Sequence, residues 1–198
     1  MTANGANAQT KTEMEAVLGA GLSVEDLNEY LYTYIKNLPT DEKYKVAIAN
    51  SIWIKDDGSL EVNPDFLQTN ADYYDAAAYK APFDDQTLAD INGWVKNNTD
   101  GMIDKILDKI DPDMVMYLIN AVLFDAEWQA QYDTGDITDS TFNAYDGAKE
   151  NAKMMSSTEY SYIEDSMAKG FVKNYAGGKY NFAALLPNDG VSIDDYVA

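Results

Sequence analysis

The chain has 198 residues, of which 46% are hydrophobic and 24% charged, a composition typical of a globular protein long enough to bury a core. Its 34 acidic and 14 basic side chains give a net charge of −20. A surface this acidic repels phosphate backbones and anionic lipids, so we expect no nucleic-acid partner and no membrane-surface role.

Missing residue types narrow the chemistry further. The sequence contains no His and no Cys, which excludes imidazole-based catalysis, thiol nucleophiles, disulfides and thiolate metal sites. With 34 acidic residues, any one pairing of carboxylates is uninformative about glycoside hydrolysis. We therefore expect no catalytic residues, no metal and no cofactor. No apolar run is long enough to span a membrane, and Met1 is not followed by a secretory leader, so no signal peptide is expected in this sequence.

The first elements in chain order are helices. Thr10 and Glu13 have the spacing of a capping box, which predicts a short helix with an apolar face ending at Gly19. Ser23 is the expected N-cap of a second helix, which Pro39 ends. Its apolar residues fall at helical spacing: Leu27, Leu31, Tyr34, Ile35 and Leu38.

A strand and two further helices follow. Residues 44–54 alternate with period two and carry apolar side chains on both faces, which predicts a strand covered on both sides. Asn63 and Pro64 begin a third helix. By propensity alone, this helix continues through residues 75–79. Leu88, Ile91, Trp94 and Val95 then define a one-sided helix expected to lie on the sheet.

The most apolar stretch, residues 114–124, predicts the central strand. Asn120 is its only strongly polar side chain. Such a run is typical of a segment buried on all sides, and its β-branched and aromatic residues favour a strand over a helix. A buried amide needs a hydrogen-bond partner, because an unpaired one costs roughly 1–3 kcal/mol. A polar group at this position suggests a sheet that has to open.

After Trp128 the sequence predicts short strands and frequent turns. Asp146-Gly147 and Gly177-Gly178 are expected turns of two antiparallel hairpins, with a further strand at residues 160–163 between them. Ser192 begins a last helix. We therefore expect two domains: residues 1–125 with the helices and main-sheet strands, and residues 126–198 with a smaller, truncated antiparallel β part.

Several ordered motifs resemble the serpin superfamily. They cover nearly all of the chain: Ala49-Asn50-Ser51-Ile52-Trp53-Ile54, Asn63-Pro64-Asp65-Phe66, Ile91-Asn92-x-Trp94-Val95-x-x-x-Thr99-x-Gly101-x-Ile103, Asn120-Ala121-x-x-Phe124 with Trp128, Met154-Met155, Tyr175-x-Gly177-Gly178, and Leu185-Leu186-Pro187. The resemblance implies an α+β fold, with a central mixed β-sheet flanked by helices and a smaller antiparallel part after it. It also implies that residues 75–79 form an edge strand of the main sheet.

The resemblance assigns structural or sheet-gating roles to five residues. Asn120 matches the buried asparagine of the family's shutter region, and Trp128 the tryptophan of its breach region at the top of the sheet. Trp94, Thr99 and Gly101 match structural positions. The alternative for Asn120 and Trp128 is that they only satisfy a folded core. Two segments depart from the family pattern: Lys173-Asn174-Tyr175 replaces an apolar-Pro-Tyr sequence, and Phe124-Asp125-Ala126 replaces Phe-Lys-Gly.

The functional hypotheses follow from the resemblance. The first is an internal fragment of a serpin-type serine protease inhibitor, lacking the N-terminal helices and the C-terminal reactive loop and so non-inhibitory itself. The second is a non-inhibitory serpin-like binding or structural module. A third, an acidic carboxylate enzyme, conflicts with the motifs. A serine protease is the expected partner of the complete protein only. The chain itself is expected to self-associate through exposed strand edges, and the composition favours a bacterial secreted or surface protein.

Overall fold

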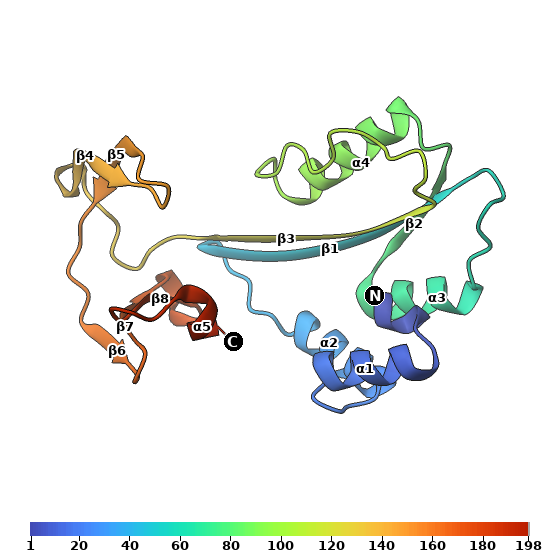
Figure 1. Cartoon of the computed structure of the whole chain (residues 1–198), viewed down its shortest axis with the longest axis horizontal. Helices are drawn as coiled ribbons and strands as arrows, with labels where there is room; N and C mark the ends of the chain where they lie inside the picture. Colours follow the sequence, from blue (N-terminus) through green and yellow to red (C-terminus); the bar gives the residue numbers. More distant parts are fainter. Residues whose placement is uncertain (198) are drawn as a thin grey trace. The chain divides into compact units, whose positions relative to one another are not determined.

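The computed structural model describes residues 1–197, which form two compact units (Figure 1). Unit 1 comprises Met1–Thr40 and Lys45–Phe124, and unit 2 comprises Asp41–Tyr44 and residues 125–197. Whether the two are independent domains, as the sequence suggested for 1–125 and 126–198, stays a prediction.

Unit 1 contains a three-stranded mixed sheet in the order β2-β1-β3. β1 (Tyr44–Lys55) pairs in parallel with β2 (Ala77–Ala81), from Ser51 opposite Ala77 to Lys55 opposite Ala81. β3 (Met116–Ala126) runs antiparallel to β1, because the Lys55 amide at the end of β1 bonds to the carbonyl of Val115 just before β3. The strand expected at residues 75–79 is therefore confirmed as an edge strand, β2, and the predicted α+β class is confirmed.

Helices cover both faces of this sheet. α4 (Asp85–Asn98) lies on one face, and the 3-10 helix η1 (Thr2–Gly5), α1 (Ala8–Leu18), α2 (Val24–Lys36) and α3 (Pro64–Tyr74) lie on the other side (Figure 1). Three helices begin at N-caps that accept a backbone N–H: Ser23 from Asp26, Asn63 from Asp65, and Asp84 from Thr87. The predicted capping box at Thr10 is wrong, because α1 begins at Ala8 and Thr10 lies inside the helix.

Two apolar clusters fill the space between the sheet and its helices. Under α4, the buried residues are Trp53, Phe83, Ile91, Val95 and Ile119. Against α3, they are Ile52, Ile54 and Ala76. Alternate residues of β1 contribute to opposite clusters, as the period of a strand requires.

The prediction that residues 114–124 are buried on all sides is wrong. Ile119, Ala121 and Leu123 point toward the covered face and are buried, whereas Leu118 is 38% and Val122 54% exposed on the other face. Tyr117 is half-buried. An apolar run does not distinguish a strand covered on both faces from one covered on a single face, because that depends on distant segments.

Unit 2 is built from short antiparallel strands. β4 (Ile137–Asn143) pairs with β5 (Lys149–Met155) around the turn at Gly147, which has φ +85°. β6 (Ser161–Glu164), β7 (Ala168–Asn174) and β8 (Asn181–Pro187) form a three-stranded sheet in that order. The two predicted hairpins are confirmed. The 3-10 helices η2 (Thr134–Asp136) and η3 (Ala176–Gly178) and the helix α5 (Ile193–Val197) complete the unit.

Candidate functional site

Asn120 on β3 is joined to β1 by a side-chain amide pair. Its Nδ2 donates to Oδ1 of Asn50 at 2.8 Å, and Nδ2 of the buried Asn50 donates to the carbonyl of Tyr74 at 2.8 Å. The predicted hydrogen-bond partner therefore exists. The expected burial is wrong, because Asn120 lies on the exposed face of β3. The pair links β3, β1 and the end of α3 inside unit 1.

The pair continues into a chain of polar side chains, which we call the amide relay. From Tyr74, the hydroxyl donates to Asn28 at 2.6 Å, Asn28 to Asn4 at 2.9 Å, Asn4 to Asn70 at 3.0 Å, and Asn70 to the carbonyl of Phe66 at 2.8 Å. Burial raises the pKa of the Tyr74 phenol, so the hydroxyl stays a donor. Each buried amide is therefore satisfied in one consistent donor direction.

The relay has no local sequence pattern. Asn4, Asn28 and Asn70 lie on η1, α2 and α3, and 66 positions separate the first from the last. Only the packing of these three elements brings them together. Sequence reasoning singled out Asn120 and missed the three asparagines of the helices.

Trp94, Thr99 and Gly101 lie at the end of α4 and form its termination. Trp94 packs against the cluster under α4. The buried Thr99 donates from Oγ1 to the carbonyl of Val95 at 2.9 Å and accepts the Ile103 amide at 3.2 Å. Gly101 has φ +80°, a conformation in which a residue without Cβ is favoured. The contacts are those of structural residues.

Asn92, within the same motif, fixes the segment that follows. Its Oδ1 accepts the amides of Ile106 and Leu107 at 2.9 and 3.1 Å, and its Nδ2 donates to the carbonyl of Leu107 at 2.9 Å. Asn92 and Thr99 thus both hold the segment that connects α4 to β3. In the sequence, only its place in the family motif pointed to Asn92.

Trp128 lies in an aromatic cluster of unit 2. Its ring stacks on Tyr175 at 4.4 Å with 8° between the planes, and meets the edge of Phe182 at 5.8 Å. Glu127 ties this segment to its neighbours, since its amide donates to the carbonyl of Lys43 and its carbonyl accepts the Ala176 amide. We call this group the joint, because residues next to the start of β1, the end of β3 and the β7–β8 hairpin meet there.

Gly177 makes the joint possible. It has φ +80°, and a Cβ at this position would lie 2.6 Å from Cε1 of Tyr44. Tyr44 in turn contacts Tyr180 edge-on at 5.4 Å. The glycine of the Tyr175-x-Gly177-Gly178 motif therefore meets a steric demand as well as a turn conformation.

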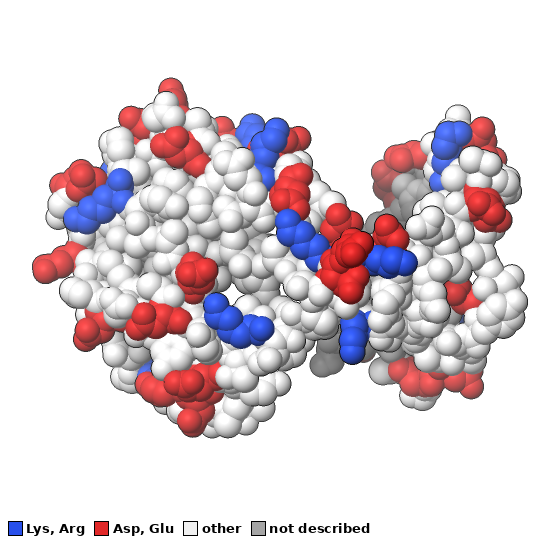
Figure 2. All heavy atoms as spheres, turned by 180° about the vertical axis from the view of Figure 1, so that it is seen from behind, with Lys and Arg blue, Asp and Glu red and all other residues white. Residues whose placement is uncertain are grey.

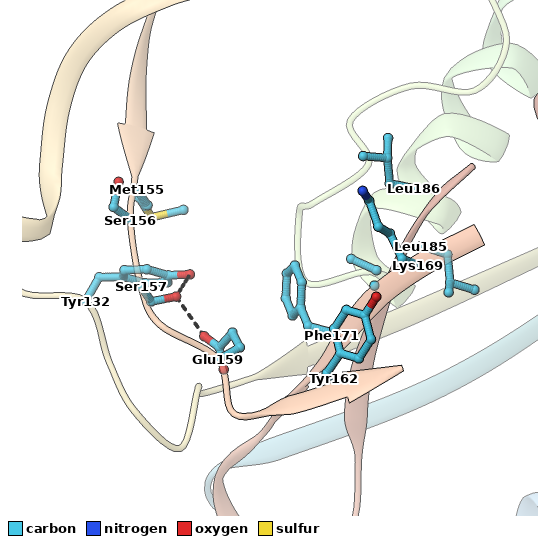
Figure 3. Close-up of a pocket in the computed structure, with 12 residues that line it drawn as sticks. Tyr132, Met155, Ser156, Ser157, Glu159, Tyr162, Lys169, Phe171, Leu185 and Leu186 are labelled. Carbon is cyan, nitrogen blue, oxygen red and sulfur yellow. Dashed lines mark hydrogen bonds between the residues drawn. The ribbon is translucent and has the colours of Figure 1, made fainter. Parts of the chain in front are cut away.

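A groove of about 650 Å³ lies beside the joint in unit 2. One wall comes from Tyr132, Met155 and the linker of residues 156–160, and the other from side chains of β6–β8, which are apolar or aromatic except for Lys169 (Figure 3). Tyr132, Ser157 and Glu159 are connected by hydrogen bonds along the first wall. Across residues 1–197 no group of three or more His, Cys, Asp or Glu side chains is placed to hold a metal ion.

On the face in Figure 2, Asp and Glu side chains are scattered and interleaved with Lys. Of the helices formed by residues 1–197, none is both long and apolar enough to cross a membrane. The acidic surface fits the expectation that nucleic acids are not partners, which stays a prediction.

Comparison with known proteins identifies the class. The family model "Serpin (serine protease inhibitor)" matches residues 1–197, so the chain belongs to the serpin family. The resemblance expected from the motifs is confirmed.

Relatives of known structure support the same assignment. The thermophilic serpin tengpin in its native state is 52% identical with a TM-score of 0.88, covering 99% of this chain and 50% of that one. A loop C-sheet serpin polymer is 50% identical with a TM-score of 0.87, covering 99% and 53%. Serpin-Z2B of Triticum aestivum is 30% identical over 197 residues, 92% of this chain and 49% of its own length. The chain thus spans about half the length of these relatives.

Proposed function

We propose that this chain is the sheet-forming part of a serpin-type serine protease inhibitor, and that it neither inhibits proteases by itself nor acts as an enzyme. The bait loop that the resemblance implies lies near the C-terminus of a complete serpin. The matched segments cover about half of the relatives' length, and the motifs quoted above are those of strands, helices and turns of the fold. The protease partner therefore belongs to the complete protein.

The observation that carries this proposal is the position of β3. The sheet order β2-β1-β3 makes it an edge strand, and its residue Asn120 is tied to β1 by the amide pair. An edge strand presents backbone N–H and C=O groups to which another strand can be added. The suicide-substrate mechanism implied by the resemblance needs such an addition beside this strand. Asn120 and Trp128 are the proposed gating residues.

The test is incubation of the chain in molar excess with trypsin-like, chymotrypsin-like and subtilisin-like enzymes. A complete inhibitory serpin, run in parallel, provides the positive control. We expect full residual protease activity and no complex that survives denaturing electrophoresis. A stable complex or stoichiometric loss of activity contradicts the proposal. Protein capture without inhibition by the complete parent protein would favour the alternative of a non-inhibitory binding module.

We also propose that the chain self-associates through strand edges. β3 in unit 1 and both β6 and β8 in unit 2 end their sheets, and a relative with 50% identity is described as a serpin polymer. The charge of −20 opposes association, but salt screens it over a Debye length of about 8 Å. Sedimentation velocity at moderate salt is expected to give a concentration-dependent dimer or larger species. A monomer over a wide concentration range contradicts this. An extracellular or cell-surface location stays a prediction.

A further inference from the structure

Lys173 is a buried lysine at the joint. It lies near the end of β7 and is 5% exposed, although lysine is almost never buried unless its charge is paired. In the family pattern this position belongs to the apolar-Pro-Tyr segment. The side chain therefore stands where an apolar residue is expected, and it keeps a charge there.

Its ammonium group meets two separate segments of the chain. From the segment after β3, the rings of Trp128 and Tyr132 lie with their centroids 5.5 and 4.6 Å from Nζ. From the linker between β5 and β6, Glu159 Oε1 lies at 2.5 Å and Ser157 Oγ at 3.3 Å. Aromatic faces and a carboxylate both stabilise a cation that has lost its water.

The contact between Lys173 and Glu159 favours the charged form of both side chains. The hydrogen bond between the two groups is the largest cause of both pKa shifts: it raises the pKa of Lys173 and lowers that of Glu159. If the Glu159 carboxylate were replaced by a neutral group, the attraction that offsets burial of the Lys173 ammonium would be lost.

The linker has one backbone tie, the amide of Ser156 to the carbonyl of Asp136 at 2.9 Å, and its next contacts are made by side chains. Residues 156–160 form no strand or helix. Their side-chain hydrogen bonds converge on one place: Tyr132 with Ser157 at 3.2 Å, Ser157 with Glu159 at 2.7 Å, and both with Lys173. Tyr132, Ser157 and Glu159 also line one wall of the groove (Figure 3). Whatever holds this linker therefore sets the position of that wall.

We propose that Lys173 is a positioning residue that acts as a latch: its ammonium group holds the linker 156–160 onto β7 beside the ring of Trp128, and its loss frees the linker and widens the groove. The two connections are separable. The cation–π contact adds to the stacking of Trp128 on Tyr175 and sets the electrostatic environment of the ring, and the ion pair holds the linker. The latch is a property of unit 2 and does not depend on whether the chain inhibits a protease.

The test compares four variants of the full chain labelled with 5-fluorotryptophan. Lys173→Met removes the charge, Lys173→Arg keeps it, Glu159→Gln removes only the carboxylate, and Lys169→Met is the control on the same strand. Fluorine NMR reports Trp128, whose resonance is assigned with Trp128→Phe. Chymotryptic cleavage after Tyr160, which is 93% exposed, reports the linker.

The proposal makes a separate prediction for each variant. Lys173→Met is expected to shift or broaden the Trp128 resonance and to speed cleavage after Tyr160 about tenfold, because the linker opens locally. Glu159→Gln should speed cleavage while leaving the Trp128 resonance in place, and Lys173→Arg should retain both signals. Lys169→Met should match the parent chain.

Three results overturn the latch. The first is that Lys173→Met behaves like Lys169→Met in both measurements, which would make Lys173 a passive core residue. If Lys173→Met does not fold, Glu159→Gln decides, and an unchanged cleavage rate after Tyr160 refutes the ion-pair connection. Loss of the Trp128 resonance position in Lys173→Arg would refute the role of the charge, since the arginine cation also stacks on aromatic faces.

Discussion

The two units of this serpin are stabilised in different ways. In unit 1, side chains from β1, α4 and β3 form a buried cluster in which Ile91 is 0% exposed. In unit 2, every residue of β4 is exposed, and the buried residues are few: Tyr44, Ala168, Lys173 and Ala176. Strands are paired through backbone hydrogen bonds in both units, but only in unit 1 does extensive burial of apolar side chains stabilise the paired strands as well.

The largest expected difference comes from the same substitution made in each unit. Ile91→Ala removes fully buried atoms under α4 and should lower the free energy of unfolding by about 2–5 kcal/mol. Ile137→Ala on β4, where the side chain is 38% exposed, should cost less than about 1 kcal/mol. Urea denaturation of both variants measures the difference. Equal losses would show that unit 2 has a core of comparable quality.

A smaller effect is expected from breaking the amide pair of Asn50 and Asn120. Asn50→Ala leaves Nδ2 of Asn120 and the carbonyl of Tyr74 without their partner and should cost about 1–3 kcal/mol. Asn120→Ala should cost less, because Asn120 is exposed and water can replace its bond. A double-mutant cycle by chemical denaturation gives the coupling energy. Strictly additive effects would mean that the pair makes no connection between β3 and β1.

The smallest effect concerns acid stability of unit 2. The hydrogen bond from Lys173 lowers the pKa of Glu159 below its ordinary value of 4.5. A lowered folded-state pKa adds stability that is fully present above 4.5 and is lost as pH falls through the folded-state value. The other charged group in this contact is Lys173, whose pKa is raised by its hydrogen bond to Glu159, so it stays charged throughout that range.

Thermal melts of the parent chain and Glu159→Gln measure this pH dependence. We expect the parent to melt higher at pH 7 and the two curves to converge below pH 4.5, where the parent carboxylate also becomes neutral. A difference that is constant with pH would mean that the ion pair does not contribute through its charge.

Sequence patterns predicted the positions of helices and strands better than they predicted which faces of those elements are buried. The apolar run at residues 114–124 identified β3, since strand propensity is local, but its covered face depends on α4, which is distant in sequence. Propensity alone favoured a helix at residues 75–79, and the family resemblance correctly favoured β2.

The candidate sites depended even more on long-range packing. Asn120 was identifiable because an amide in an apolar run needs a partner, yet Asn50 is 70 positions away. Lys173 was visible only as a departure from the family pattern, because its partner Glu159 lies in a linker without periodicity. Physical chemistry states that such groups need partners, and the tertiary fold decides which ones.

Native-state hydrogen exchange tests the difference between the units most directly. The protein should be dilute enough that association does not protect strand edges. We predict that amides of β1 at residues 51–54 and of α4 exchange only through global unfolding, and that amides of the β4–β5 hairpin exchange at least about a hundredfold faster by local opening. Equal protection of the β4–β5 hairpin and β1 would contradict the account.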